Sequence, residues 1–135
     1  MGENFLEQVK GKLIVSCQAL PNEPLHSSFI MSRMALAAQL AGAAGIRANS
    51  VVDIQAIQDE VELPIIGLSK VDYPDSSVYI TPTLKEMRAV AATGAQAVAC
   101  DLTRRKRPNG EQIADIVSQM RNEFPETLLM ADTAT

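Results

Sequence analysis

Residues 64–70 read PIIGLSK, an unbroken apolar run, Pro64–Leu68, followed directly by a serine and a lysine. Four similar runs lie elsewhere in the chain, at Leu13–Cys17, Gly45–Ala48, Ala97–Cys100 and Leu128–Ala131. Unbroken runs this short are unlike amphipathic helices and are typical of strands that are buried on both faces. The sequence therefore predicts five buried strands.

The segments between these runs have the periodicity of helices. Within Phe29–Ala41 the residues that recur at three- and four-residue intervals, and that we expect on the buried face, are Ile30, Met34, Ala37 and Ala41. Three further helices are predicted from their capping residues: Ser50 to Glu60, Thr83 with Glu86 to Gly94, and Glu111–Glu123 capped by Asn109. Strands that alternate with helices of this length pair in parallel through right-handed crossovers, so the predicted class is α/β.

Composition excludes several classes of protein. No apolar run approaches the roughly 18 residues that cross a bilayer, and the first residues, MGENFLEQVKGK, lack the apolar core of a signal peptide. We therefore expect a cytoplasmic protein with no membrane partner. No linker-like tract divides residues 1–135, which predicts a single domain. Cys17 and Cys100 lie inside apolar runs without metal-binding or disulfide spacing, and we expect buried, reduced thiols.

One dense basic cluster, Arg104–Arg107, stands out in a chain with a net charge of −4. A cluster of this kind can attract phosphate or nucleic acid, but on an acidic protein it is more typical of a solvated loop. Aromatic side chains for base stacking are absent around it. We expect an exposed loop here and no nucleic-acid partner.

Each apolar run leads into polar residues: Ser16 and Gln18, Arg47 and Asn49, Lys70 and Asp72, Asp101 and Thr103, Asp132 and Thr133. The carboxyl ends of parallel strands lie on one side of the sheet, so these residues are predicted to converge on one pocket. A doubly wound nucleotide-binding sheet would also place a ligand there. The segment after the first run, SCQALPNEPL, has neither of the glycine-rich motifs that such a sheet normally carries.

Six motifs in order resemble the N-acetylmannosamine-6-phosphate 2-epimerases, from about residue 5 to the last residue: LIVSCQAL (13–20), GIRAN (45–49), IGLSK with DYPD (66–75), ITPTLKE (80–86), residues 101–107, and LLMAD (128–132). The resemblance implies a TIM (β/α)8 barrel, of which residues 1–135 would form about five βα units, the amino-terminal part of an incomplete barrel. A catalytic glutamate and the phosphate site are expected on later strands, outside this chain.

The resemblance also implies an activity. The family interconverts N-acetylmannosamine 6-phosphate and N-acetylglucosamine 6-phosphate in sialic acid and amino sugar catabolism, without a redox or metal cofactor. Inverting the carbon next to a carbonyl needs an acid/base and donors for the enolate oxygen. By the match of motifs, Lys70 is the expected catalytic residue, and Gln18, Arg47 and Asp132 are expected to bind the sugar. Asp101 is a weaker candidate, because it could instead hold the loop Leu102–Pro108.

Other interpretations stay open. Lys70 could be a structural lysine paired with Asp72 or Asp132, or the Schiff-base lysine of an aldolase that acts on a phosphorylated sugar. The chain could also be a non-catalytic half-barrel that is stable only as an oligomer, because the first and fifth strands would leave unpaired edges. We expect residues 1–135 alone to be inactive and to form a homo-oligomer.

Overall fold

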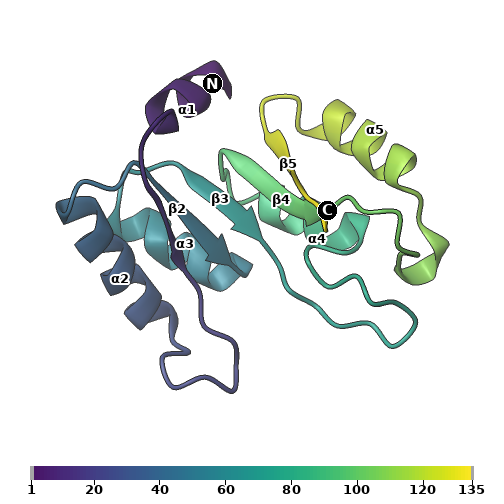
Figure 1. The fold of residues 1–135 in the computed structure, drawn as a ribbon, viewed down its shortest axis with the longest axis horizontal. Coiled ribbons are helices and arrows are strands. Elements are labelled where there is room, and N and C mark those ends of the chain that lie inside the picture. The colour runs from purple at the N-terminus through teal and green to yellow at the C-terminus, as the bar shows by residue number, and fades with distance from the viewer. Residues whose placement is uncertain (1, 135) are drawn as a thin grey trace.

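The structure, a computed structural model, describes residues 2–134, in which strands and helices alternate along the chain (Figure 1). In chain order the elements are α1 (Gly2–Val9), β1 (Ile14–Cys17), α2 (Ser28–Leu40), β2 (Gly45–Asn49), α3 (Val51–Glu60), β3 (Ile65–Leu68), α4 (Leu84–Ala91), β4 (Ala97–Asp101), the short 3₁₀ helix η1 (Pro108–Gly110), α5 (Ile113–Glu123) and β5 (Leu128–Asp132). Within residues 2–134, no helix has the length and apolar character needed to cross a membrane.

The five strands form one parallel sheet in the order β1-β2-β3-β4-β5. This arrangement confirms the predicted α/β class, and every predicted strand is present with its boundaries shifted by at most one residue. At their carboxyl ends β2, β4 and β5 each extend by one polar residue beyond the apolar run: Asn49, Asp101 and Asp132. These polar residues are therefore held by the sheet itself and not by a loop.

The two faces of the sheet bury different sets of side chains, because successive residues of a strand point to opposite faces. The outer face packs against the helices, and its strand residues include Cys17, Ile46, Ala48, Ile65, Val98 and Cys100. The inner face carries a smaller apolar cluster that includes Ile66, Leu68, Ala97 and Ala99, with Ile14, Leu128 and Met130 at its margin. The polar strand-end residues continue this inner face toward the carboxyl ends of the strands.

Helix α1 closes the opposite, amino-terminal end of the inner face. Phe5 is 3% exposed and belongs to the inner apolar cluster, and Val9, one turn later, packs against the same cluster. In Figure 1, α1 lies beyond the amino-terminal ends of the strands, on the side away from the loops that follow them. This helix was not predicted from the sequence.

Helix α2 buries a different face from the one predicted. Its buried residues are Met31, Ser32 and Ala35, whereas Met34 is 36% exposed and the side chain of Ala37 also faces solvent. The helix, SFIMSRMALAAQL, is apolar nearly all round, so two stripes offset by one residue fit the helical period equally well. Only packing against the sheet and α3 distinguishes between them.

Two of the three predicted caps are confirmed. Ser50 caps α3 by accepting a hydrogen bond from the backbone amide of Asp53, and Thr83 with Glu86 forms the capping box of α4. The prediction that Asn109 caps α5 is wrong, since Asn109 lies inside η1 with a φ of 61° and Gln112 precedes α5. Asparagine adopts this left-handed conformation more easily than most residues, which suits Asn109 to the turn.

The sheet is opened between β3 and β4. Their ladder has the register Ile66 to Ala97 and Gly67 to Val98 and stops there. Beyond it the segment Tyr79–Thr81, which we call the wedge, lies between the two strands. Ile80 forms an antiparallel bridge with Lys70 on one side, and its carbonyl accepts a hydrogen bond from the amide of Asp101 on the other, at 3.0 Å.

Candidate functional site

The five predicted site residues lie in or directly after the five strands, at the carboxyl-terminal end of the inner face, which we call the mouth. Arg47 lies within β2, Asp101 and Asp132 are register partners at the ends of β4 and β5, and Lys70 follows β3 by two residues. Because the register keeps these positions in phase, the side chains emerge on the same face. Gln18 occupies the equivalent position just after β1.

Arg47 and Asp132 are brought into direct contact across this mouth. Nη2 of Arg47 lies 2.7 Å from Oδ2 of Asp132, and Nη1 lies 4.0 Å from the sulfur of Met130. Both charged side chains are about a quarter exposed, at 24% and 25%. The pair is therefore shielded by the sheet on one side and open to a ligand on the other.

Lys70 is half-buried and its backbone is tightly held. Its amide donates a 2.8 Å hydrogen bond to Oδ1 of Asn49, a buried side chain at the end of β2. Among the side chains of residues 4–134, no ion pair joins Lys70 to either of its predicted partners. Asp132 pairs with Arg47 instead, and Asp72 is in none of the ion pairs. The lysine lines a hollow of about 620 Å³ with Asp72, Leu20, Pro21, Asn22 and Tyr79.

Gln18 has an unused hydrogen-bond acceptor. Its Nε2 donates to the hydroxyl of Ser16 at 2.9 Å, which orients the amide. The other amide atom, Oε1, is buried and finds no hydrogen-bond partner within residues 2–134. A buried acceptor left in this condition costs free energy unless a ligand or water supplies a donor.

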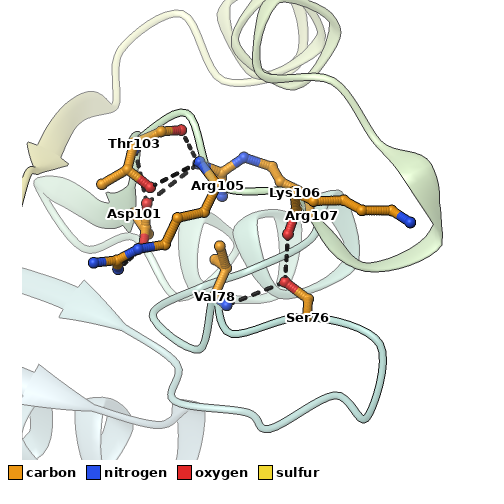
Figure 2. Close-up of polar contacts among 7 residues, drawn as sticks. All are labelled: Ser76, Val78, Asp101, Thr103, Arg105, Lys106 and Arg107. Atoms are coloured by element: carbon orange, nitrogen blue, oxygen red, sulfur yellow. Dashed lines mark hydrogen bonds and ion pairs between the residues drawn. The ribbon is translucent and has the colours of Figure 1, made fainter.

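Asp101 is occupied by its own loop. Oδ1 accepts a 2.8 Å hydrogen bond from the amide of Thr103, and the guanidinium groups of Arg107 and Arg105 lie 3.4 Å from its two oxygens (Figure 2). Burial by itself raises the pKa of this carboxyl, but the hydrogen bonds from Thr103 and the charges of Arg107 and Arg105 outweigh burial and lower it. The contacts are those of a residue that holds the loop after β4.

The expectation of a fully solvated basic cluster is wrong for its last member. Arg107 is 3% exposed and also donates a 3.2 Å hydrogen bond to the carbonyl of Thr103. Its neighbours Arg104, Arg105 and Lys106 are exposed, as predicted. The ion pair with Asp101 accounts for the burial of one arginine, because a buried charge needs a partner of opposite sign.

The long loop after β3 is anchored to the rest of the mouth. Ser76 donates from its hydroxyl to the carbonyl of Lys106 at 2.5 Å and accepts from the amide of Val78 at 3.1 Å, so the loops after β3 and β4 are joined (Figure 2). Tyr73 donates a 2.7 Å hydrogen bond to Glu86, and this bond raises the pKa of the phenol. The loop therefore forms a fixed wall beside Lys70.

Two residues that matter for the geometry of Lys70 were not singled out from the sequence. From the sequence, Asn49 is only one of several polar strand-end residues and Thr81 is only a member of the motif ITPTLKE, with no role predicted for either. An asparagine at the end of a buried strand was the available signal for the first. Nothing in the sequence indicates that Thr81 hydrogen-bonds to Ser69, just after β3, and to Ala99 on β4, because these bonds form only when the wedge returns between the two strands.

The cysteines lie outside the site. Both are free and buried, as predicted, on the face of the sheet that the helices cover. Burial raises the pKa of Cys17, and it raises the pKa of Cys100 to about 12. Neither thiol is suited to nucleophilic chemistry at neutral pH.

The sequence of this chain is similar to that of a known protein family. A sequence-family model described as "Putative N-acetylmannosamine-6-phosphate epimerase" matches residues 31–135. Two similar curated proteins carry the name "Putative N-acetylmannosamine-6-phosphate 2-epimerase". The one from Lactiplantibacillus plantarum is 79% identical over all 135 residues, and the one from Pediococcus pentosaceus is 74% identical over the same length. The chain spans 59% of the length of each.

Solved structures agree with the sequence matches. An N-acetylmannosamine-6-phosphate 2-epimerase from Clostridium perfringens superposes with a TM-score of 0.92 at 53% identity, covering 96% of this chain and 56% of that one. A rubisco-like protein from Burkholderia fungorum superposes with a TM-score of 0.56 at 17% identity, a level that speaks for the fold alone. The five strands and the helices that connect them thus correspond to just over half of the Clostridium chain.

Proposed function

This chain belongs to the N-acetylmannosamine-6-phosphate epimerase family. We propose that, as part of a full-length enzyme, it inverts C2 of N-acetylmannosamine 6-phosphate to give N-acetylglucosamine 6-phosphate. The observation that carries the proposal is the Arg47–Asp132 ion pair at the carboxyl-terminal end of the inner face, with Lys70 two residues after β3, the strand next to β2. We further propose that the reaction belongs to amino sugar catabolism in the cytosol and uses no cofactor.

The chemistry assigns a task to each residue. The proton on C2 is acidic because the C1 aldehyde of the open-chain sugar takes up the charge as an enolate. Lys70, for which the side chains of residues 4–134 supply no ion-pair partner, exchanges this proton on one face of the carbon. Arg47 supplies donors to oxygens of the sugar, and Asp132 accepts from its hydroxyls while holding the guanidinium in place.

Gln18 completes the sugar contacts in this proposal. Its Oε1 is a buried acceptor already aimed by the bond from Nε2 to Ser16, and a sugar hydroxyl would satisfy it. Asp101 contributes indirectly, by holding the loop after β4. We assign it no direct contact with the substrate.

The 135-residue chain alone is proposed to be inactive. Epimerisation requires a proton to leave one face of C2 and another to arrive on the opposite face, and the curated relatives are longer than this chain, which spans 59% of their length. We propose that the second proton-transferring group and the phosphate site lie in the part of the longer relatives that residues 1–135 do not match. A self-associating state is also proposed for the isolated chain, because β1 and β5 are the edge strands of its sheet.

The test uses a hybrid in which residues 1–135 replace the matching part of the Lactiplantibacillus plantarum relative, hereafter the hybrid. In D₂O, proton NMR should show N-acetylglucosamine 6-phosphate forming from N-acetylmannosamine 6-phosphate, with solvent deuterium entering C2. Lys70→Met should lower kcat by roughly 10²- to 10⁴-fold, the range for a lost acid/base. Lys85→Met, which changes an exposed lysine on α4, should leave kcat unchanged.

Two results would contradict the proposal. The first is a hybrid that binds the sugar phosphate but exchanges no deuterium at C2. The second is a covalent adduct of the substrate on Lys70 that is trapped by reduction with borohydride, which would indicate Schiff-base chemistry instead.

A further inference from the structure

The wedge contains a residue in an unfavourable backbone conformation. Thr81 has a φ of 47°, in the left-handed region, and its side chain is 1% exposed. A β-branched residue rarely adopts positive φ, because its Cβ substituents crowd the backbone. Strain of this kind persists only where surrounding contacts enforce it, and it is concentrated at functional sites.

The contacts of Thr81 explain what enforces the strain. Its hydroxyl donates a 2.6 Å hydrogen bond to the carbonyl of Ala99 on β4 and accepts a 3.1 Å bond from the amide of Ser69. Its own amide donates to the carbonyl of Ser69 at 2.8 Å. Thr81 thus supplies both backbone partners of the residue before Lys70, at the point where the β3–β4 ladder has ended.

The amide of Lys70 is held from the other side. Asn49, 8% exposed at the end of β2, accepts the hydrogen bond from this amide through Oδ1 at 2.8 Å. The antiparallel bridge to Ile80 and the 2.9 Å bond from the amide of Val71 to the carbonyl of Tyr79 continue the support on the side of the wedge. The peptide planes on both sides of the Lys70 Cα are therefore restrained by two neighbouring elements.

We propose that Thr81 and Asn49 are positioning residues that clamp the backbone of Lys70 and so set the direction in which its side chain enters the mouth. The proposal rests on the proposed function, because it takes Lys70 as the proton-transferring group. Neither residue is assigned a contact with substrate. A reacting group must be held within a fraction of an ångström of its working position, and a shift of about 1 Å can cost roughly 100-fold in rate.

Thr93 offers a matched control. Its hydroxyl donates to the carbonyl of Val90 at 2.6 Å and accepts from the amide of Ala95 at 3.2 Å, so it makes the same two kinds of bond as Thr81. It lies between α4 and β4, at the end of the sheet away from Lys70. Thr81→Val and Thr93→Val therefore remove equivalent bonds at opposite ends of the fold.

In the hybrid, Thr81→Val and Asn49→Ala should each lower kcat at least tenfold while KM changes less than twofold, because the substrate-binding residues are left in place. Thr81→Ser keeps the hydroxyl and should restore kcat to within threefold of the parent. Thr93→Val should leave kcat within twofold, even where its thermal midpoint falls as much as that of Thr81→Val. Equal losses of kcat in the two valine variants would overturn the proposal.

A second measurement does not depend on activity. Amide hydrogen exchange, read by NMR in the hybrid, should speed up roughly tenfold at Ser69 in Thr81→Val and at Lys70 in Asn49→Ala, because each change removes the acceptor of that amide, and both amides should stay unchanged in Thr93→Val. Unchanged exchange at these two amides would refute the clamp whatever the kinetics. An inactive parent hybrid with the expected exchange would refute the proposed epimerase function while leaving the backbone clamp in place.

Discussion

Arg47 on β2 and Asp132 on β5 form an ion pair of 2.7 Å although two strands, β3 and β4, lie between them. In a flat sheet, strands three places apart would be separated by about 14 Å. The contact therefore reflects a sheet that curls around its inner face, as a barrel wall does. The same curl makes it possible for Lys70, from the strand next to β2, to share a mouth with both residues.

Arg47→Met in the hybrid should lower kcat/KM for N-acetylmannosamine 6-phosphate by about 100-fold, the cost typical of a lost donor to developing charge. Steady-state kinetics on the purified hybrid would measure it. The control is Arg88→Met, which breaks a 2.7 Å ion pair with Glu123 on the exposed outer surface and should leave kcat/KM unchanged. Equal kinetics in both variants would remove Arg47 from the site.

We expect the lowered pKa of Asp101 to make the stability of the fold depend on pH. Its pKa is lowered in the folded state, so its contribution is complete above the ordinary value of about 4 and is lost as the pH falls through the lower folded value. Asp101→Asn should reduce the free energy of unfolding of the hybrid by about 1–3 kcal/mol at pH 7, because it leaves the buried Arg107 without its charge partner.

The difference between Asp101→Asn and the parent should begin to narrow below about pH 4, where Asp101 of the unfolded chain becomes protonated, and should be lost as the pH falls through the lower pKa of the folded state. Urea unfolding at several pH values would follow it. Glu123→Gln removes an exposed ion pair and should leave the unfolding midpoint nearly unchanged. A difference that is constant from pH 7 to pH 3 would count against the assigned role of Asp101.

Gly67 in β3 has no room for a side chain. A Cβ at this position would lie 2.7 Å from Cγ1 of Val90 and 2.8 Å from Cδ1 of Ile54, both buried side chains of the helices behind the sheet. Gly67→Ala should therefore destabilise the hybrid by about 1–3 kcal/mol through overpacking. Gly45→Ala, where the nearest atoms lie at 3.4 Å, should cost clearly less, and thermal unfolding of the two variants would compare them directly.

We expect the thiols of Cys17 and Cys100 to be unreactive in the folded protein. Burial raises the pKa of Cys100 to about 12 and also raises that of Cys17, so almost no thiolate forms at neutral pH. A thiol reagent such as DTNB should label neither residue in the folded hybrid within minutes and both after denaturation. Mass spectrometry of the labelled peptides would separate these two sites from any cysteine of the appended segment.

The strands were predictable from the sequence because both of their faces are buried, which leaves unbroken apolar runs such as Pro64–Leu68. Parallel order predicted that Arg47 and Asp132 lie at the same end of the sheet, whereas their direct contact also depends on the curl of the sheet. Helix α1 escaped prediction because only Phe5 and Val9 are apolar on its buried face, a pattern too short to stand out in a polar segment.

Other features depend on tertiary contacts that no local pattern encodes. Arg107 looks like its exposed neighbours in sequence, and its burial follows from its ion pair with Asp101, six residues earlier at the end of β4. The strained conformation of Thr81 likewise exists only because the loop returns between β3 and β4. Both cases concern loops after strands, where the path of the loop decides which side chains are buried.

The return of Tyr79–Thr81 between β3 and β4 makes this connection a structural member of the sheet, so little of it is free to vary in length. Tyr73, Asp75 and Ser76 are tied to Glu86, Asn109 and Lys106, and the last residues before α4 hydrogen-bond to both strands. An insertion or deletion in this connection would displace Tyr79–Thr81 and with it the alignment of β3 and β4. Inserted residues, whether engineered or acquired in evolution, should be tolerated better in another connection of this fold.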